Sequence, residues 1–161
     1  MSEFSHIDGN GRVRMVDVTP KASTDRTAVA QGFVSMTVET FRAIRDQQVK
    51  KGNVLETARI AGIMAAKKTA ELIPMCHPLN ITHAQIDFFW DQDEPVIRIE
   101  SRVRIHHQTG VEMEALTAVS IAALTIYDMC KSFDKQMTIS GISLLKKTGG
   151  KSGTFIRTTP E

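Results

Sequence analysis

The sequence predicts an α+β fold, with a largely antiparallel sheet covered by helices on one face. Three segments, 27–38, 81–90 and 95–107, alternate apolar and polar residues with a period of two, which is typical of half-buried strands. Longer segments with apolar residues at helical spacing lie between them. These strands and helices segregate rather than alternate strictly, which favours antiparallel pairing. The chain has 161 residues, 42% of them hydrophobic, which is enough for one well-buried core.

The first expected strand covers residues 27–38. It places Ala28, Ala30 and Val34 on one face, which we expect to be the core face. A short amphipathic helix over residues 39–48 follows. The first part of the chain therefore predicts a strand that leads directly into a helix.

A longer helix is expected to begin after Asn53 and to run to about Leu72. Asn53 is a suitable N-cap, and Glu56 stands three residues later, as in a capping box. Residues 58–66 are small or apolar nearly all round, so this helix needs close neighbours on several sides. Pro74 ends the helical pattern.

The second half of the chain predicts a hairpin, a helix and a final strand. The strands of the hairpin cover residues 81–90 and 95–107, and a polar loop joins them. One face of this pair is expected to pack on helices, and the other to meet water or another subunit. A long helix over residues 112–133 and a last strand over residues 137–145 complete the pattern.

We divide the chain into a flexible segment 1–14, a single α+β domain 15–148 that carries the chemistry, and a Gly-rich basic tail 149–161. The tail region resembles a P-loop but lacks its first glycine, because position 145 is Leu145. Few residues follow Lys151, so the helix that a P-loop opens has no room. We interpret the tail as a mobile basic segment that can fold over an anion.

Composition excludes several classes of protein. The first residues carry acids and have no apolar stretch, so they do not form a signal peptide, and no apolar run is long enough for a membrane helix. Two cysteines do not make a disulfide scaffold, so we expect a cytoplasmic protein. A net charge of +2 is too small for a protein that binds duplex nucleic acid, although a small anionic ligand fits it.

The segment Pro74-Met75-Cys76-His77-Pro78 is the first candidate for chemistry. Its prolines hold a cysteine and a histidine in a stiff, extended stretch, which suits a pocket wall. A buried cysteine beside a histidine bonded to backbone explains the segment equally well. Zinc is disfavoured, because the chain has no paired C-x-x-C and adjacent extended residues point in opposite directions.

The second candidate is the helix over residues 112–133. Glu112 and Glu114 lie at its start, where the helix dipole favours negative charge, and Asp128 and Lys131 share a face near its end. A surface ion pair would explain Asp128 and Lys131. However, the neighbouring apolar residues indicate a partly buried face, on which Lys131 would have a lowered pKa and serve as an acid or base.

Cations are the third candidate. Several stand at the ends of expected helices and strands, where they can converge on phosphate, although most lysines are simply solvated. They are Arg26, Lys51, Lys67, Lys68, Lys146, Lys147 and Lys151.

Taken together, these segments resemble the MoaC family, the cyclic pyranopterin monophosphate synthases of molybdenum cofactor biosynthesis. Seven matching pieces occur in chain order between residues 15 and 153. They are MVDV at 15–18, KKG at 50–52, TARIAGIMAAKK at 57–68, LIPMCHPL at 72–79, TGVEMEAL at 109–116, AALTIYDMCK at 122–131 and GGKSG at 149–153.

The resemblance implies a ferredoxin-like sandwich and a lyase activity. Such an enzyme converts 3′,8-cyclo-7,8-dihydro-GTP into cyclic pyranopterin monophosphate and releases diphosphate by general acid/base catalysis. It implies no cofactor, with Mg²⁺ at the phosphates as an option, and no metal site in the protein. It also implies a homohexamer, a trimer of dimers, with active sites between subunits.

The resemblance also implies roles for individual residues. Asp128, Lys131 and Lys51 match catalytic residues of the family. The matching substrate-binding residues are Met75, Cys76, His77, Glu112, Met113, Glu114, Asp17, Lys21, Arg26, Lys67 and Lys147. As ionised acceptors, the two glutamates would hold the amino groups derived from guanine. A site shared between subunits would also mean that Lys51 need not lie near Asp128 within one chain.

This sequence departs from the family pattern at His106-His107-Gln108, where relatives often carry Gly-Lys, so phosphate affinity or pH dependence would differ if this loop meets phosphate. Two other functions stay open on the residues alone. One is a non-catalytic module for nucleotide or RNA, although the hairpin lacks the paired aromatics of an RNA-recognition surface. The other is a thiol-dependent or metal enzyme that uses Cys76, Cys130 and His77.

Overall fold

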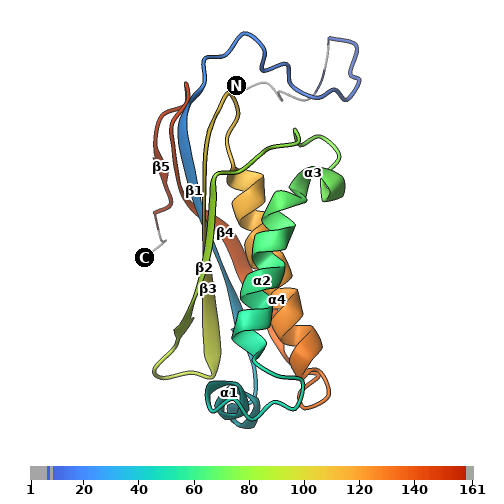
Figure 1. Ribbon diagram of the computed structural model, residues 1–161, viewed down its shortest axis with the longest axis vertical. Coiled ribbons are helices and arrows are strands. Elements are labelled where there is room, and N and C mark those ends of the chain that lie inside the picture. Colours follow the sequence, from blue (N-terminus) through green and yellow to red (C-terminus); the bar gives the residue numbers. More distant parts are fainter. Residues whose placement is uncertain (1–6, 8, 159–161) are drawn as a thin grey trace.

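A five-stranded antiparallel sheet forms one layer of the computed structural model, which describes residues 7 and 9–158, and helices cover one face of the sheet (Figure 1). The strand order across the sheet is β2-β3-β1-β4-β5. The elements are β1 (Thr24–Ser35), α1 (Val38–Arg45), α2 (Val54–Lys67), α3 (Thr69–Leu72), β2 (His83–Trp90), β3 (Val96–His107), α4 (Glu112–Cys130), β4 (Thr138–Thr148) and β5 (Phe155–Ile156).

The predicted α+β class is confirmed, and so is the ferredoxin-like arrangement. Each half of the fold is a strand, a helix and a strand, and β1 and β3 occupy the middle of the sheet. Ala28 and Ala30 lie on the core side of β1, as the alternation predicts. The two long helices, α2 and α4, lie side by side on that face (Figure 1).

The first strand and helix are displaced from their predicted bounds. The strand was expected over residues 27–38, but β1 ends at Ser35 because Thr37 caps α1. The side-chain oxygen of Thr37 accepts a hydrogen bond from the amide of Thr40, and the amide of Thr37 donates to the carboxylate of Asp134 at 2.8 Å. Val38 is therefore the first residue of the helix.

The long helix predicted up to Leu72 is broken. It becomes α2 and α3, because Lys68 leaves helical geometry and the hydroxyl of Thr69 donates to the carbonyls of Ala65 and Ala66. The helix over residues 112–133 is also shorter than predicted. It ends at Cys130, whose carbonyl accepts the amides of the two residues that close the turn, Phe133 and Asp134.

The last predicted strand, over residues 137–145, extends further as β4. Beyond it, β5 pairs with Lys146 and Lys147 and adds an edge strand within the stretch 149–161. Parts of the predicted terminal segments, residues 1–6, 8 and 159–161, lie outside the described residues.

Small residues allow α2 and α4 to approach closely. A Cβ at Gly62 would lie 2.8 Å from the carbonyl oxygen of Ala118 and would overlap the side chain of Ile86. Ser101 in β3 donates from its hydroxyl to the carbonyl of Ala115 at 2.7 Å, which ties α4 to the sheet. The long central helix is therefore fixed on two sides.

α4 is the one described helix that is long and apolar enough to cross a membrane. It packs on β1, β3, β4 and α2, and its alanines face them. Its apolar composition is that of a core helix.

Candidate active site

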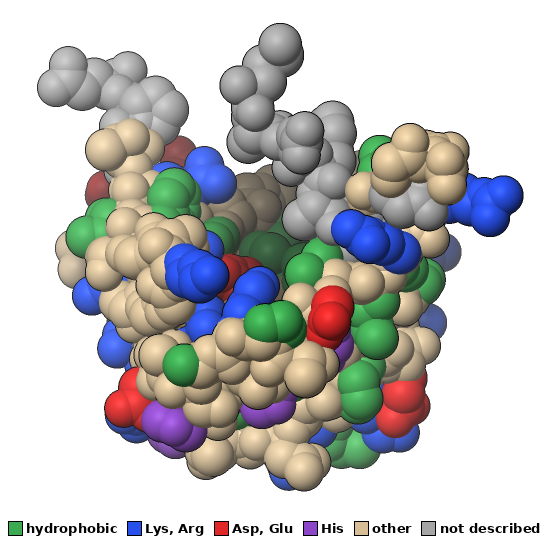
Figure 2. All heavy atoms as spheres, turned by 90° about the horizontal axis from the view of Figure 1, so that it is seen from above, with side chains coloured by type: hydrophobic (Ala, Val, Ile, Leu, Met, Phe, Trp, Pro, Cys, Tyr) green, Lys and Arg blue, Asp and Glu red, His purple; other side chains and the backbone are tan. Residues whose placement is uncertain are grey.

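A cavity of about 400 Å³ opens at the end of the molecule where α4 begins. Figure 2 looks down on this end and shows a hollow with lysine and arginine side chains around it. Its volume falls in the range of small-ligand sites. The lining residues are Val16, Val18, Lys21, Arg26, Met75, Cys76, His77, Leu79, Gln108, Thr109, Gly110, Glu112, Met113, Glu114, Lys147 and Ser152.

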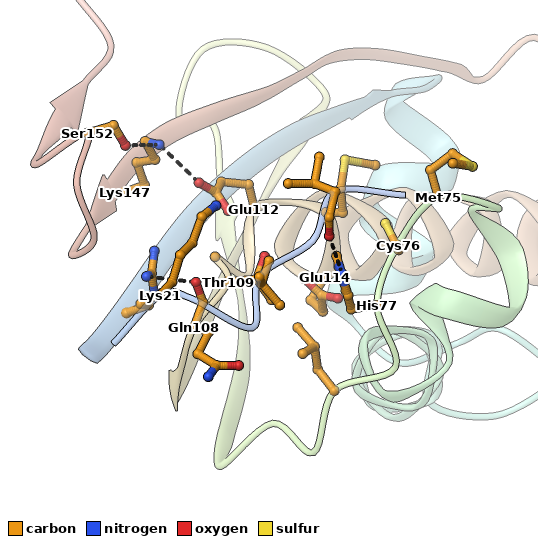
Figure 3. A pocket seen from close by; sticks show the side chains of 16 residues that line it. Lys21, Met75, Cys76, His77, Gln108, Thr109, Glu112, Glu114, Lys147 and Ser152 are labelled. Atoms are coloured by element: carbon orange, nitrogen blue, oxygen red, sulfur yellow. Dashed lines mark hydrogen bonds and ion pairs between the residues drawn. The ribbon is translucent and has the colours of Figure 1, made fainter. Parts of the chain in front are cut away.

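The cavity has a cationic side and a side with sulfur, imidazole and carboxyl groups (Figure 3). Lys21 and Lys147 lie on the first side, near the start of the chain and the end of β4. Cys76 and His77 lie on the second side, in the extended stretch after α3. The cavity therefore presents different chemistry to the two ends of a ligand.

Lys147 is held by two partners on the cationic side. Its ammonium group lies 3.2 Å from a carboxylate oxygen of Glu112 and donates to the hydroxyl of Ser152 at 2.8 Å. Ser152 belongs to the Gly-rich tail, so this contact ties the tail to the cationic side of the cavity (Figure 3).

Arg26 connects two loops that border the cavity. Its guanidinium donates to the carbonyls of His107 and Gln108, both at 2.9 Å. Gly150, at positive φ, lies so close to this guanidinium that a Cβ there would overlap it. Arg26 thus contacts two segments. One is the stretch 106–108, where the sequence departs from the family pattern, and the other is the Gly-rich tail.

His77 fixes the N-terminal stretch to the cavity wall. Its Nε2 donates to the carbonyl of Val16 at 2.9 Å. Cys76 also lines the cavity and follows a turn at residues 74–75. Both residues of the predicted pocket wall thus border one cavity.

Glu114 is the buried carboxyl of the cavity, only 4% exposed. Burial, together with the negative charge of Glu112, raises its pKa to about 7. Glu114 also raises the pKa of the Cys76 thiol, which burial raises most. The expected role of Glu114 as an ionised acceptor stays a prediction, and its raised pKa makes the neutral form accessible as well.

Two of the predicted substrate-binding residues lie beside the cavity rather than in its wall. Asp17 lies between two lining residues, and its carboxylate accepts from the amide of Thr19 at 2.9 Å. Lys67 lines a neighbouring cavity of about 390 Å³, behind the 75–79 stretch. Glu114 and Leu79 line both cavities and so stand between them.

The three predicted catalytic residues form a separate cluster at the far end of α4. The Nζ of Lys131 lies 2.7 Å from a carboxylate oxygen of Asp128, and the Nζ of Lys51 donates to the carbonyl of Asp128 at 2.9 Å. Lys51 and Asp128 are therefore neighbours within one chain, which the family resemblance did not require.

The ion pair at this end is exposed. The side chains of Asp128 and Lys131 are 62% and 53% exposed in the single chain. Lys131 lowers the pKa of Asp128, and Asp128 in turn raises that of Lys131. The sequence-based expectation of a lowered Lys131 pKa is wrong for an isolated chain, because no residue in the described part of the chain covers the pair and Asp128 raises that pKa.

The cluster and the cavity are well separated. Glu112 and Asp128 stand sixteen residues apart on α4, which corresponds to about 24 Å along the helix axis. The structure thus brings the predicted residues together as two groups at opposite ends of one helix. It does not join the groups within one chain.

Sequence reasoning did not assign a site role to several lining residues. Val16 and Val18 flank Asp17 in the MVDV motif, and Gln108 and Ser152 lie in stretches already noted for other reasons. Val16 contributes its backbone carbonyl, which side-chain patterns do not reveal. Position within a matched motif was the one available signal.

Metal-binding and thiol chemistry can be tested against the same geometry. The described residues contain no group of three or more His, Cys, Asp or Glu side chains that suits a metal ion. Burial raises the pKa of Cys130 to about 11, and the pKa of Cys76 is also raised. Both thiols are therefore protonated near neutral pH, which disfavours them as nucleophiles.

Comparison with known proteins gives one consistent result. A model of the MoaC family matches residues 15–150. The cyclic pyranopterin monophosphate synthase of Desulfatibacillum aliphaticivorans is 64% identical over 156 residues, 97% of this chain and 98% of the relative. That of Desulforapulum autotrophicum is 63% identical over 97% of this chain and 96% of the relative. That of Heliobacterium modesticaldum is 57% identical over 98% of this chain and 99% of the relative.

Proposed function

The chain belongs to the MoaC family, and we propose that it converts 3′,8-cyclo-7,8-dihydro-GTP into cyclic pyranopterin monophosphate and diphosphate. It is a lyase of molybdenum cofactor biosynthesis that acts on a nucleotide-derived substrate. The reaction opens a purine-derived ring, recloses it as a pterin and forms a cyclic phosphate. Each change needs protons delivered and removed at defined atoms.

The cavity supplies the binding half of this activity. Lys21, Arg26 and Lys147 gather on one side, where their positive charges can neutralise a triphosphate, the two lysines as point charges. Met75, Cys76, His77 and Met113 leave a less charged surface for the rings. Asp17 supports the wall, and Lys67 lies behind it. A ligand would therefore bind with its phosphates toward the tail.

The separation along α4 is the observation that carries the arrangement of the site. Asp128, Lys131 and Lys51 are about 24 Å from Glu112 by helix rise, too far to touch a ligand in the same chain's cavity. Two copies in antiparallel contact would bring the far cluster of one to the cavity of the other. The active site therefore lies between subunits.

One surface ridge of α4 fits this contact. Leu116, Ser120 and Leu124 follow one another at helical spacing on the side away from the sheet, and Leu124 is 53% exposed. Glu112 and Asp128 each lie eight residues from Ser120. A two-fold axis at Ser120 would place Glu112 opposite the partner subunit's Asp128.

Contact between copies would also change the chemistry of the cluster. Removing Asp128 and Lys131 from water strengthens their interaction with each other and with substrate. Desolvation would lower the pKa of Lys131 toward the range in which a lysine transfers protons. Lys51 supplies a second ammonium group beside the same carboxylate. We expect three such dimers in a hexamer, in the cytoplasm.

Mixing two inactive variants tests the shared site. Lys131→Ala and Glu112→Ala each remove one half, so each pure protein should make no product. A mixture that exchanges subunits should recover up to about a quarter of wild-type activity, because mixed dimers hold one intact site of two. Product is measured as pterin fluorescence after oxidation. Failure of exchanged mixtures to recover any activity would place both halves in one chain.

A further inference from the structure

The two glutamates at the start of α4 are in opposite situations. Glu112 is 30% exposed at its side chain and lies 3.2 Å from Lys147. Glu114 is 4% exposed, and no ion pair joins it to a lysine or arginine in the described part of the chain. Two carboxyl groups of one pocket in different surroundings commonly divide acid and base roles.

From this contrast we propose that Glu114 is a neutral carboxylic acid that donates a proton to the bound substrate and later takes one back. This inference rests on the proposed function. In the step, the O–H bond of the Glu114 carboxyl breaks and an N–H or O–H bond forms on the ring that opens. When the ring recloses, the carboxylate recovers a proton, so the enzyme gains no net charge over the cycle.

Burial is the physical reason for the neutral form. A carboxylate removed from water without a cationic partner is costly, so the group keeps its proton instead. The pKa of about 7 agrees with this geometry and would make Glu114 both a usable donor and a usable acceptor near neutral pH.

The charged groups around Glu114 do not cancel this effect. The other titratable groups in the wall of the main cavity are Lys21, Arg26, Cys76, His77, Glu112 and Lys147. Lys147 is paired with Glu112, and Arg26 is bonded to two carbonyls.

The second cavity adds Lys67, Lys68 and Glu71, of which the last two face each other at 3.8 Å. Among the described groups of one chain, Glu112 thus adds a like charge, and no lysine or arginine forms an ion pair with Glu114; in the proposed dimer the partner subunit's cluster would lie opposite Glu112, so the test below is made on the assembled protein.

The position of Glu114 between two cavities gives it a way to recover its proton. It lines the main cavity, where the substrate would bind, and also the cavity of about 390 Å³ behind it. With substrate in the first cavity, water can still reach the carboxyl from the second. Glu112 lines only the first of these two cavities and stays paired with Lys147.

Infrared spectroscopy of the substrate-free protein tests the protonation state directly. Wild-type protein at pH 6 should show the C=O band of a protonated carboxyl group, and titration to pH 9 should remove it. Glu114→Gln should lack the band, whereas the matched variant Glu112→Gln should keep it. A wild-type spectrum without this band at pH 6 would overturn the proposal.

Kinetics test whether the proton is used. Glu114→Gln has the shape of the neutral acid but cannot release its proton. It should change KM by no more than about threefold, lower kcat by on the order of 10²-fold or more, and remove the near-neutral inflection from the pH profile of kcat. Glu114→Asp keeps a carboxyl and should retain part of kcat even if Glu114→Gln folds poorly.

The two proposals fail in different ways. If wild-type protein makes no product, the proposed function is wrong and the donor role falls with it. If wild-type protein is active and Glu114→Gln keeps its kcat and its inflection, the donor role alone is wrong.

Discussion

The two ends of α4 carry carboxyl groups of the same kind under different conditions. At the first turn, Glu114 is enclosed by the protein, and burial raises its pKa to about 7. At the last turn, Asp128 is exposed, and the Lys131 ammonium lowers its pKa. The chain by itself therefore removes the carboxyl at the first end from water, whereas it leaves the carboxyl at the far end exposed.

This difference shows what the isolated chain provides. The fold by itself builds a binding cavity with a desolvated acid. It leaves Lys131 in water beside Asp128, which raises the pKa of its ammonium group and so disfavours proton transfer near neutral pH. In the proposed dimer a second copy would cover the exposed end, and assembly would then be part of the chemistry.

The largest expected effect concerns the exposed end. Lys131→Ala should lower kcat/KM by about 10²- to 10⁴-fold, because it removes a proton-transfer group. Its melting temperature as a single folded chain should change by no more than about 2 °C, because exposed ion pairs contribute little. Product formation and thermal unfolding are measured on the same samples. The matched control is Lys135→Ala, which changes an exposed lysine four residues later and should keep full activity. If Lys131→Ala turned over substrate at the wild-type rate, the far cluster would have no part in the mechanism.

The second prediction tests how the two ends meet. Ser120→Cys should form a disulfide between copies that captures more than about half of the chains, because residues near a two-fold axis face their own symmetry mates. Non-reducing electrophoresis measures the dimer. The control is Gln85→Cys, on the uncovered face of the sheet, which also retains Cys76 and Cys130. It should form no disulfide between copies and should run as a single chain on the gel. Equal cross-linking of both variants would argue against the α4 contact.

The third prediction uses the pH dependence of stability at the buried end. Because the folded pKa of Glu114 lies above its ordinary value of 4.5, the native state binds an extra proton between about pH 4.5 and 7. This proton uptake contributes to the free energy of unfolding. The contribution is fully present below pH 4.5 and is lost as the pH rises through about 7. Glu114→Gln should therefore match wild type at pH 5 and exceed it at pH 8 by about 1–3 kcal/mol.

Urea unfolding at the two pH values measures this difference. Glu112→Gln is the control, and it should show no gain at pH 8 because it loses the ion pair with Lys147. A gain of equal size at both pH values in Glu114→Gln would mean that the group does not titrate in this range.

The smallest effect concerns the loops around the cavity. Arg26→Lys keeps the charge but cannot hold the carbonyls of His107 and Gln108 together. KM should rise about 3- to 30-fold with a smaller change in kcat, and amide hydrogen exchange of residues 106–110 should accelerate. Arg104→Lys, on the open face of the sheet, should change neither quantity. An unchanged exchange rate in Arg26→Lys would show that the loop does not depend on the guanidinium.

Local pattern predicted the strands and helices well, and it failed at several of their ends. The break at Lys68 accompanies a local bond of the Thr69 hydroxyl back to Ala65, whereas the start of α1 depends on Asp134, almost a hundred residues away. Neither contact has a periodic signature. The added strand β5 is only two residues long, so alternation could not reveal it.

The sequence by itself determined the fold class, the family and the kinds of groups at the site, because hydrophobic periodicity and motif residues are written along the chain. Tertiary structure decided which groups meet. It placed Lys51 beside Asp128 and buried Glu114 but not Glu112. Burial and distance arise from packing between remote elements, and these two quantities set the protonation state of a carboxyl group.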